Sequence, residues 1–346
     1  MTSGRLSTLA AISGKSSIRN LIAGAVGVLI GGFLQLMIQF PASKRIGWIP
    51  RISFNFKQPA IIETLSLFGP ALLAIAAVQI NILIGTILAT LLDTGAVSYL
   101  YYADRIVQLP LALFGIAMST ALLPTLAGHL AKGRQSEAGA DLRLGLAWLT
   151  WLTLPAVVGA FYLAEPIVVT LFERGAFSHA DSLATAQTLQ AYAVGLIAFC
   201  WVRLLASACY AQKDAKAPMR YAAVSVAVNI VLAVIFMQFW AYVGLALATS
   251  LAAFVNVVLL YMRLTKTYGS LLDASSLKRL LTALIASLLM LAYLMGFETQ
   301  WAFPADGVMQ GLWMAAAISG AILVFLLSAL ILGERAMLLK FLKRKT

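Results

Sequence analysis

The chain has 346 residues, of which 62% are hydrophobic and 11% are charged, and its formal net charge is +12. So few polar residues cannot cover a soluble globule, and this composition predicts a protein whose surface meets membrane lipid. The basic residues are spread at intervals along the chain and are not gathered on one module, which argues against nucleic acid as a partner.

Nine apolar spans can be counted, because a membrane-crossing helix needs about 20 apolar residues. The longest run, 221–262, is long enough for two spans, and Trp240, Tyr242 and Gly244 near its middle predict a tight hairpin at a membrane interface. The runs in chain order are 21–43, 64–92, 106–131, 144–164, 182–212, 221–262, 280–297 and 307–333.

Basic residues fall in every second gap between these spans. The gaps 44–63, 132–143, 213–220 and 263–279 and the tail 334–346 hold 4, 3, 3, 4 and 5 Lys or Arg, which is 19 of the 25 in the chain. Cytoplasmic loops of membrane proteins carry such an excess, so these segments are predicted to be cytoplasmic and the opposite loops, which are acidic, to lie outside. The fold class is therefore an all-α, multi-pass membrane protein with a cytoplasmic C-terminus.

The first segments raise a question of orientation. The polar segment 1–20 is basic, and 21–43 is as long as a span and lacks a convincing cleavage site, so it is read as a membrane helix and not as a signal peptide. Segment 44–63 mixes basic and aromatic residues and suits the headgroup layer. With nine spans and a cytoplasmic C-terminus, the basic segment 1–20 would lie outside, against the charge rule. We therefore expect further spans upstream.

Motifs of enzymes and metal sites do not stand out. The sequence has no GxSxG, no HExxH and no paired intramembrane aspartates, and Cys200 and Cys209 lie half a helical revolution apart. A reaction centre needs a nucleophile, a base and a stabilising group that converge. The sequence therefore predicts a transporter that is not an enzyme and that has no metal site and no cofactor.

An acid and a base, Asp104 and Arg105, stand together before the third span. In one interpretation, Asp104 caps the start of the helix and Arg105 reaches out to the interface. In the other, Arg105 faces a water-filled cavity and binds an anionic headgroup, because the planar guanidinium matches phosphate oxygens. Arg203, about two turns before the end of its span, raises the same choice, and its position favours the interface.

Several local sequences occur together, in a fixed order, in one family of membrane proteins. They are Gly31–Leu36, Gln39–Pro41, Tyr101–Pro110, Leu122–Pro124, Leu171–Phe177, Ala191–Leu196 and Tyr210–Pro218. Together they resemble the successive signatures of the MurJ (MviN) lipid II flippases, and the similarity runs from about residue 21 to the C-terminus. The chain also resembles, more distantly, the multidrug and oligosaccharide exporters of the same superfamily.

This resemblance implies a fold of two six-helix lobes around a central cavity, followed by two helices that form a groove for a lipid tail. On that pattern, 21–43 is the last helix of the first lobe, 64–262 is the second lobe, 280–333 is the groove pair and 334–346 is a basic tail. The first five helices would then be missing, so we expect a truncated or split gene.

The resemblance also implies a function. Members move lipid II, an undecaprenyl pyrophosphate that carries a sugar–peptide headgroup, across the bacterial inner membrane by alternating access, driven by the membrane potential or an ion gradient. Arg105 matches a functionally important arginine of the family, with Asp104 as its acidic neighbour. Gln108 stands where the family often has a glutamate. Asn229 is similar in position to a sodium ligand of some members, although no acidic residue stands beside it.

Two other functions stay open. The chain could be a multidrug or O-antigen-type exporter of the same superfamily, or a non-transporting half-module. The half-module would need a separately encoded first lobe, or a second copy of the chain, as its partner.

Overall fold

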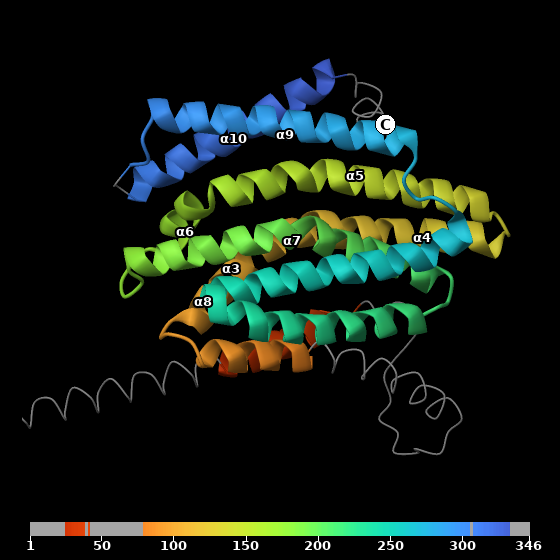
Figure 1. Ribbon diagram of the computed structural model, residues 1–346, viewed down its shortest axis with the longest axis horizontal. Coiled ribbons are helices and arrows are strands. Elements are labelled where there is room, and N and C mark those ends of the chain that lie inside the picture. The colour runs from red at the N-terminus through yellow and green to blue at the C-terminus, as the bar shows by residue number, and fades with distance from the viewer. Residues whose placement is uncertain (1–24, 39–40, 42–78, 305–306, 333–346) are drawn as a thin grey trace, which may run out of the picture. The chain divides into compact units, whose positions relative to one another are not determined.

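The structure is a computed structural model that describes residues 25–38, 41, 79–304 and 307–332 (Figure 1). All regular elements in these ranges are helices. The chain divides into two units, Met1–Phe68 and Gly69–Thr346, of which the first contains the helix Ala25–Ile38. The second contains the helix Gln79–Thr90, then α3 Ala96–Pro110, the π-helix η1 Leu111–Ile116, α4 Ala117–Ala131, α5 Gln135–Tyr162, α6 Ala164–Phe172, α7 His179–Ala211, α8 Lys216–Tyr268, α9 Ala274–Gln300 and α10 Gly307–Ile331.

Helix α7 is the element against which most of the second unit packs. It contacts α3, η1, α4, α5, α6 and α8, and Figure 1 shows it between α5 and α8. Its start is fixed by a capping box, in which the side chain of Ser178 accepts from the backbone N–H of Asp181 and the carboxylate of Asp181 accepts from the backbone N–H of Ser178 at 2.8 Å. This reciprocal pair satisfies backbone donors that have no partner inside the helix.

The contact between α7 and α8 is closest at Gly195. A Cβ atom at this position would lie 2.8 Å from the Cα atom of Ser250, so only glycine fits. The hydroxyl of Ser250 donates to the backbone oxygen of Ala191 at 2.8 Å and so finds a partner within the interface. Membrane helices associate through such small residues and interhelical hydrogen bonds. In lipid, no hydrophobic effect drives their apolar side chains together.

Helix α8 is a hairpin of two arms, as the sequence predicts. Trp240 (φ −128°, ψ 17°) and Ala241 (φ 45°, ψ −126°) leave the helical region, and we call these two residues the elbow. A Cβ atom on Gly244 would lie 2.3 Å from the backbone oxygen of Phe236, so the glycine lets the arms approach closely. Figure 1 shows the two arms side by side. The hairpin prediction is confirmed.

The helix that begins at α3 continues through η1 and α4 over 36 residues, with a widened turn in the middle. Pro110 immediately precedes η1 and has no N–H for the regular helical bond, which accounts for the change of hydrogen-bonding pattern. Gly115 in this turn packs on α7, where a Cβ atom would lie 3.2 Å from the Cα atom of Cys200.

The structure gathers the predicted cytoplasmic and outer loops at different ends of the second unit. At one end, Arg263 of α8 binds Asp214, in the turn before α8, at 2.9 Å. At the other, the hydroxyl of Tyr99, near the start of α3, donates to Asp181 of α7 at 2.7 Å. The basic turns therefore share one end and the acidic loops share the other, as the alternation of charge in the sequence predicts. Which end faces the cytoplasm stays a prediction.

The described residues contain six helices long and apolar enough to cross a membrane, one of which is the α8 hairpin. The third span begins at Ala96, ten residues earlier than predicted, and the predicted loop after 164 contains the short helix α6. Two more predicted spans appear as the shorter apolar helices Ala25–Ile38 and Gln79–Thr90. The segments 1–20, 44–63 and 334–346 lie outside the described residues.

The last two helices form a pair that packs on α5 and α6. Helix α9 contacts α5 and α10, and α10 contacts α6. The carboxylate of Asp273 caps α9 by accepting from the backbone N–H of Ser276 at 2.8 Å. The rings of Trp151 and Phe325, whose centroids are 4.9 Å apart, join α5 to α10. The predicted role of this pair as a lipid-tail groove stays a prediction.

The Gly195 contact gives a test of the packing. Gly195→Ala should lower stability by about 1–3 kcal/mol, the usual cost of overpacking, because the new methyl group meets the backbone of Ser250. Gly128→Ala in α4 is the control, since a Cβ atom there has open space, and it should leave stability unchanged or raise it by up to about 1 kcal/mol. Thermal unfolding in detergent micelles measures both. Equal midpoints for the two variants would contradict the close contact.

Candidate functional site

A cavity of about 650 Å³ lies among the helix Gln79–Thr90, α3, α7 and both arms of α8. Its volume is in the range of sites that bind small molecules. Its lining includes all five residues that the sequence singled out, from three different helices. They are Asp104, Arg105, Gln108, Arg203 and Asn229.

On α3, Gln108 joins the acid to the base. The Gln108 carbonyl oxygen accepts from Nη1 of Arg105 at 3.0 Å, and the Gln108 amide nitrogen donates to Asp104 at 2.5 Å. The guanidinium carbon of Arg105 also lies 4.7 Å from the ring centroid of Tyr101, which is a cation–π contact. One turn of helix therefore holds the exposed guanidinium from two sides.

The capping interpretation of Asp104 is wrong. The N-cap of α3 is Gly95, in a left-handed conformation (φ 107°), and Asp104 lies two turns inside the helix. Asp104 and Arg105 are charged, so the apolar run begins only after them, although the helix itself starts at Ala96. The helix continues through the pair because the side chain of Gln108 satisfies both groups locally.

The Leu171–Phe177 signature, which comprises the end of α6 and the loop that follows it, supports this part of α3 from outside the cavity. The ring of Tyr102 contacts Phe172 and Phe177, with centroids 4.7 and 5.4 Å away. Tyr102 in turn meets the edge of Tyr101 at 5.7 Å. A continuous aromatic contact thus leads from the loop to the ring that lies under Arg105.

A contact between the exposed His179 and the half-buried Glu173 stabilises the same loop. Nδ1 of His179 lies 3.0 Å from the carboxylate of Glu173. Burial raises the pKa of Glu173, but hydrogen bonds from Ser182 and His179 outweigh it and hold the pKa below its ordinary value. The stability that Glu173 contributes is therefore present above the ordinary pKa of a glutamate and is lost as the pH falls through the lower, folded-state pKa.

Arg203 brings a second guanidinium to the cavity. The side chain is exposed and lies in the cavity lining with Phe199, one turn earlier on α7. The sequence favoured an interfacial role for Arg203 because of its distance from the helix end. The structure places it in the lining with Arg105, so the cavity carries two guanidiniums and one carboxylate, Asp104, among its described residues.

Side-chain amides line the opposite wall, and sequence reasoning missed two of them. Asn229 donates from Nδ2 to the side-chain oxygen of Asn81 at 2.9 Å. Asn229 and Asn256 are 8% and 9% exposed, and their side-chain oxygens have no hydrogen-bond partner among the described residues. Asn81 and Asn256 each interrupt an apolar run, and a polar residue inside a span is a signal that could have found them.

No carboxylate accompanies these amides among the described residues, and the sodium site that the resemblance implies for Asn229 stays a prediction. The partner of Asn229 is the neutral Asn81, and the carboxylate of the cavity, Asp104, belongs to the Gln108 contact on α3. No group of three His, Cys, Asp or Glu side chains that could hold a metal ion occurs among the described residues.

The arrangement is suited to binding an anion at the polar groups of a mixed polar and apolar cavity between membrane helices. Two guanidiniums supply planar, charged donors, which match phosphate oxygens in pairs. Asn and Gln side chains add neutral donors and acceptors for the other polar atoms of a ligand. A charged headgroup that crosses the membrane needs such a site, because it cannot enter hydrocarbon without compensation.

Comparison with known proteins decides the family. The family model described as lipid II flippase MurJ matches residues 8–326. This chain belongs to the MurJ lipid II flippase family. A probable lipid II flippase MurJ of Vibrio cholerae serotype O1 is 38% identical over 68% of this chain and 45% of that protein. Its counterpart in Haemophilus influenzae is 34% identical over 91% of this chain and 63% of that protein.

A solved structure described as lipid II flippase MurJ in an inward closed conformation shares the fold. Its TM-score is 0.69 at 28% identity, with 83% of this chain and 57% of that chain covered. This chain thus spans about half to two thirds of the length of the MurJ relatives it matches. The Tyr101–Pro110 signature read from the sequence coincides with the turn of α3 that presents Arg105 to the cavity.

The Gln108 contact predicts how reactive the Arg105 side chain is. Gln108→Leu removes the hydrogen bond to Arg105, so an arginine-specific dicarbonyl reagent should modify Arg105 about fivefold faster, which corresponds to the loss of one typical hydrogen bond. Modification rates can be read by mass spectrometry of peptides. Arg203, in the same cavity and without contact to Gln108 among the described bonds, is the internal reference. An equal acceleration at both arginines would show general opening instead.

Proposed function

We propose that this chain takes part in moving lipid II across the bacterial inner membrane, with Arg105 and Arg203 binding the pyrophosphate of the headgroup. The observation that carries the proposal is the position of Arg105, held by Gln108 and the ring of Tyr101, in a cavity between membrane-crossing helices that contains a second guanidinium. Family membership supports lipid II as the substrate.

The cavity walls also suggest how the headgroup is held. The guanidiniums come from α3 and α7, and the amides of Asn229 and Asn256 come from the two arms of α8. A pyrophosphate near the arginines leaves the sugar and peptide groups to meet the amides, which donate and accept hydrogen bonds without charge. The undecaprenyl chain stays in lipid, where it needs no polar partner.

The transport cycle requires a second wall for the cavity. Transporters built from two repeats rock one lobe against the other around a site at their interface. We propose that the unit described here works against a first lobe of the MurJ type, with the membrane potential or an ion gradient as the driving force. The cycle as proposed uses no cofactor.

Complementation tests the role of Arg105. In cells depleted of their own lipid II flippase, this chain is expressed together with the first lobe of a MurJ relative. Arg105→Ala should reduce lipid II translocation at least about tenfold, because it removes charge-assisted hydrogen bonds, and Arg105→Lys should recover only part, because an ammonium lacks the planar fork.

Arg220→Ala is the matched control, since Arg220 is an exposed arginine near the start of α8 that does not line the cavity. It should transport like the parent chain at equal expression. Full activity of Arg105→Ala would refute the role of Arg105. Transport of drugs but not of lipid II, by the parent protein, would favour a multidrug exporter. Activity of the chain without a first lobe would favour a cavity formed by two copies.

Cysteine labelling tests the proposed orientation, with the C-terminus in the cytoplasm. In a background without Cys200 and Cys209, single cysteines at the exposed residues Ser136 and Ser270 should be protected from an impermeant thiol reagent added outside intact cells. Cysteines at Ala176 should react. Protection should disappear when the membrane is permeabilised. Rapid labelling of Ser136 or Ser270 positions in intact cells would reverse the orientation.

A further inference from the structure

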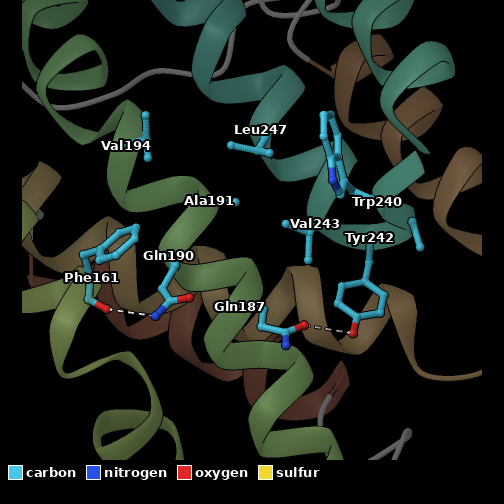
Figure 2. A pocket seen from close by; sticks show the side chains of 10 residues that line it. Phe161, Gln187, Gln190, Ala191, Val194, Trp240, Tyr242, Val243 and Leu247 are labelled. Atoms are coloured by element: carbon cyan, nitrogen blue, oxygen red, sulfur yellow. Dashed lines mark hydrogen bonds between the residues drawn. The ribbon is translucent and has the colours of Figure 1, made fainter. Parts of the chain in front are cut away.

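A second hollow lies at the elbow of α8, apart from the cavity that contains Arg105. We call it the elbow groove, and it has a volume of about 480 Å³. It is lined by the end of α5, by α7 and by the second arm of α8 (Figure 2). Along α7, its residues Gln187, Ala191 and Val194 recur at the spacing of one helical face, whereas the cavity takes Tyr192, Phe199 and Arg203 from another face. The two hollows are therefore separate sites.

The groove is polar at one end and apolar at the other. Figure 2 shows the side chains of Gln187, Gln190 and Tyr242 at one end and those of Val194 and Leu247 at the other. Both α7 and the second arm of α8 run from the end where Tyr99 contacts Asp181 and Tyr242. The polar groups therefore lie near the outer end of the helices, and the apolar groups lie deeper, about 10 Å further along α7.

The groove offers hydrogen-bond donors that the protein does not use. The side-chain oxygen of Gln187 accepts a hydrogen bond from the hydroxyl of Tyr242 at 3.5 Å. The side-chain nitrogen of Gln190 donates to the backbone oxygen of Phe161 at 3.1 Å. Among the described residues, the amide nitrogen of Gln187 at the polar end and the indole nitrogen of Trp240, which Figure 2 shows nearer to Leu247, have no hydrogen-bond acceptor, and both residues are exposed. These N–H groups remain available to a ligand.

The charge around the groove limits the kind of ligand. Among the described lining residues there is no Lys, Arg, Asp or Glu, so the groove lacks the basic cluster that recognises anionic lipid headgroups. The nearby carboxylate of Asp181 is bound by Tyr99, whose ring lies 5.2 Å from that of Tyr242. Asp181 does not line the groove, but its negative charge lies behind the Tyr242 wall, beyond Tyr99. A negative charge on this side disfavours an anionic headgroup and favours a headgroup that ends in a cationic group.

We propose that the elbow groove binds one phospholipid with a zwitterionic headgroup. The phosphate and ester oxygens accept hydrogen bonds from Gln187 and Trp240, the cationic end of the headgroup faces Asp181, and one acyl chain lies along Val194 and Leu247. The groove has room for a chain and the neck of the headgroup, and the second chain stays in the bilayer.

Photo-crosslinking tests this site with the full chain in nanodiscs of equal parts phosphatidylcholine and phosphatidylglycerol. A trace of phosphatidylcholine with a diazirine in its acyl chain should label Val194 and Leu247 more strongly than Leu312 and Ile322, which are exposed apolar residues of α10. Mass spectrometry of peptides locates the adducts. A diazirine-bearing phosphatidylglycerol should label the groove less.

The double variant Gln187→Ala, Trp240→Phe removes the free donors and keeps the aromatic ring. It should lower labelling of Val194 and Leu247 by about fivefold to thirtyfold, which is the loss expected for two hydrogen bonds. Gln238→Ala is the control, because Gln238 is an exposed amide two residues before the elbow that does not line the groove. It should label like the parent chain.

Three results would overturn the proposal. The first is labelling of the groove no stronger than that of α10, which would mean ordinary contact with surrounding lipid. The second is unchanged labelling in the double variant, with its helical content and unfolding midpoint equal to those of the parent. The third is equal labelling of the groove by phosphatidylcholine and phosphatidylglycerol probes, which would show that charge plays no part.

Discussion

The close contact between α7 and α8 at Gly195 and Ser250 is the interaction on which both hollows depend. The cavity that contains Arg105 and the elbow groove are each bounded by these two helices, on different faces of α7. The helices can approach to this distance only because Gly195 has no side chain, and the hydroxyl of Ser250 does not remain unpaired, because it donates to Ala191. The separation fixed there therefore sets the width of both hollows.

The Gln108 contact has a chemical consequence for the cavity. A carboxylate bound directly to Arg105 would compete with an anionic ligand for the guanidinium, whereas a neutral amide competes weakly. Gln108 also has a defined orientation, because its oxygen must face Arg105 and its nitrogen must face Asp104. In the reversed amide, the N–H group would face the N–H groups of Arg105, and the oxygen would face the carboxylate of Asp104. The guanidinium is thus fixed in place without its charge being cancelled.

The sequence predicts the helices of this chain well where composition alone decides. The α8 hairpin follows from an apolar run too long for one span, with aromatic residues and Gly244 near its middle. Helix α6 was missed because Glu165 and Pro166 break the apolar run, although both stand in its first turn. An acidic residue is favourable in the first turn because it interacts with the positive end of the helix dipole. Proline is tolerated there because the N–H groups of the first turn have no acceptor inside the helix.

The site was harder to predict than the fold. The five candidate residues were found from charge and resemblance, and the structure brings them to one cavity. Asn81 and Asn256 were missed because they are 175 positions apart on different helices, and no spacing in the sequence relates them to Asn229. Only the packing of the helix Gln79–Thr90 against the α8 hairpin places the amides of Asn81 and Asn229 within 2.9 Å. Contacts between distant helices carry no local signal.

The two faces of α7 show how a membrane helix separates its polar groups. A polar side chain in a span is costly unless the protein provides partners, so Arg203 lies toward the cavity with the other polar residues. Gln187 lies on the other face, and Tyr242 accounts for only part of its hydrogen-bonding capacity. Its free N–H groups lie near the end of the helices, where the proposed phospholipid would present its phosphate and ester oxygens. A polar residue on this face is therefore tolerated where the lipid itself can supply the acceptor that the protein does not.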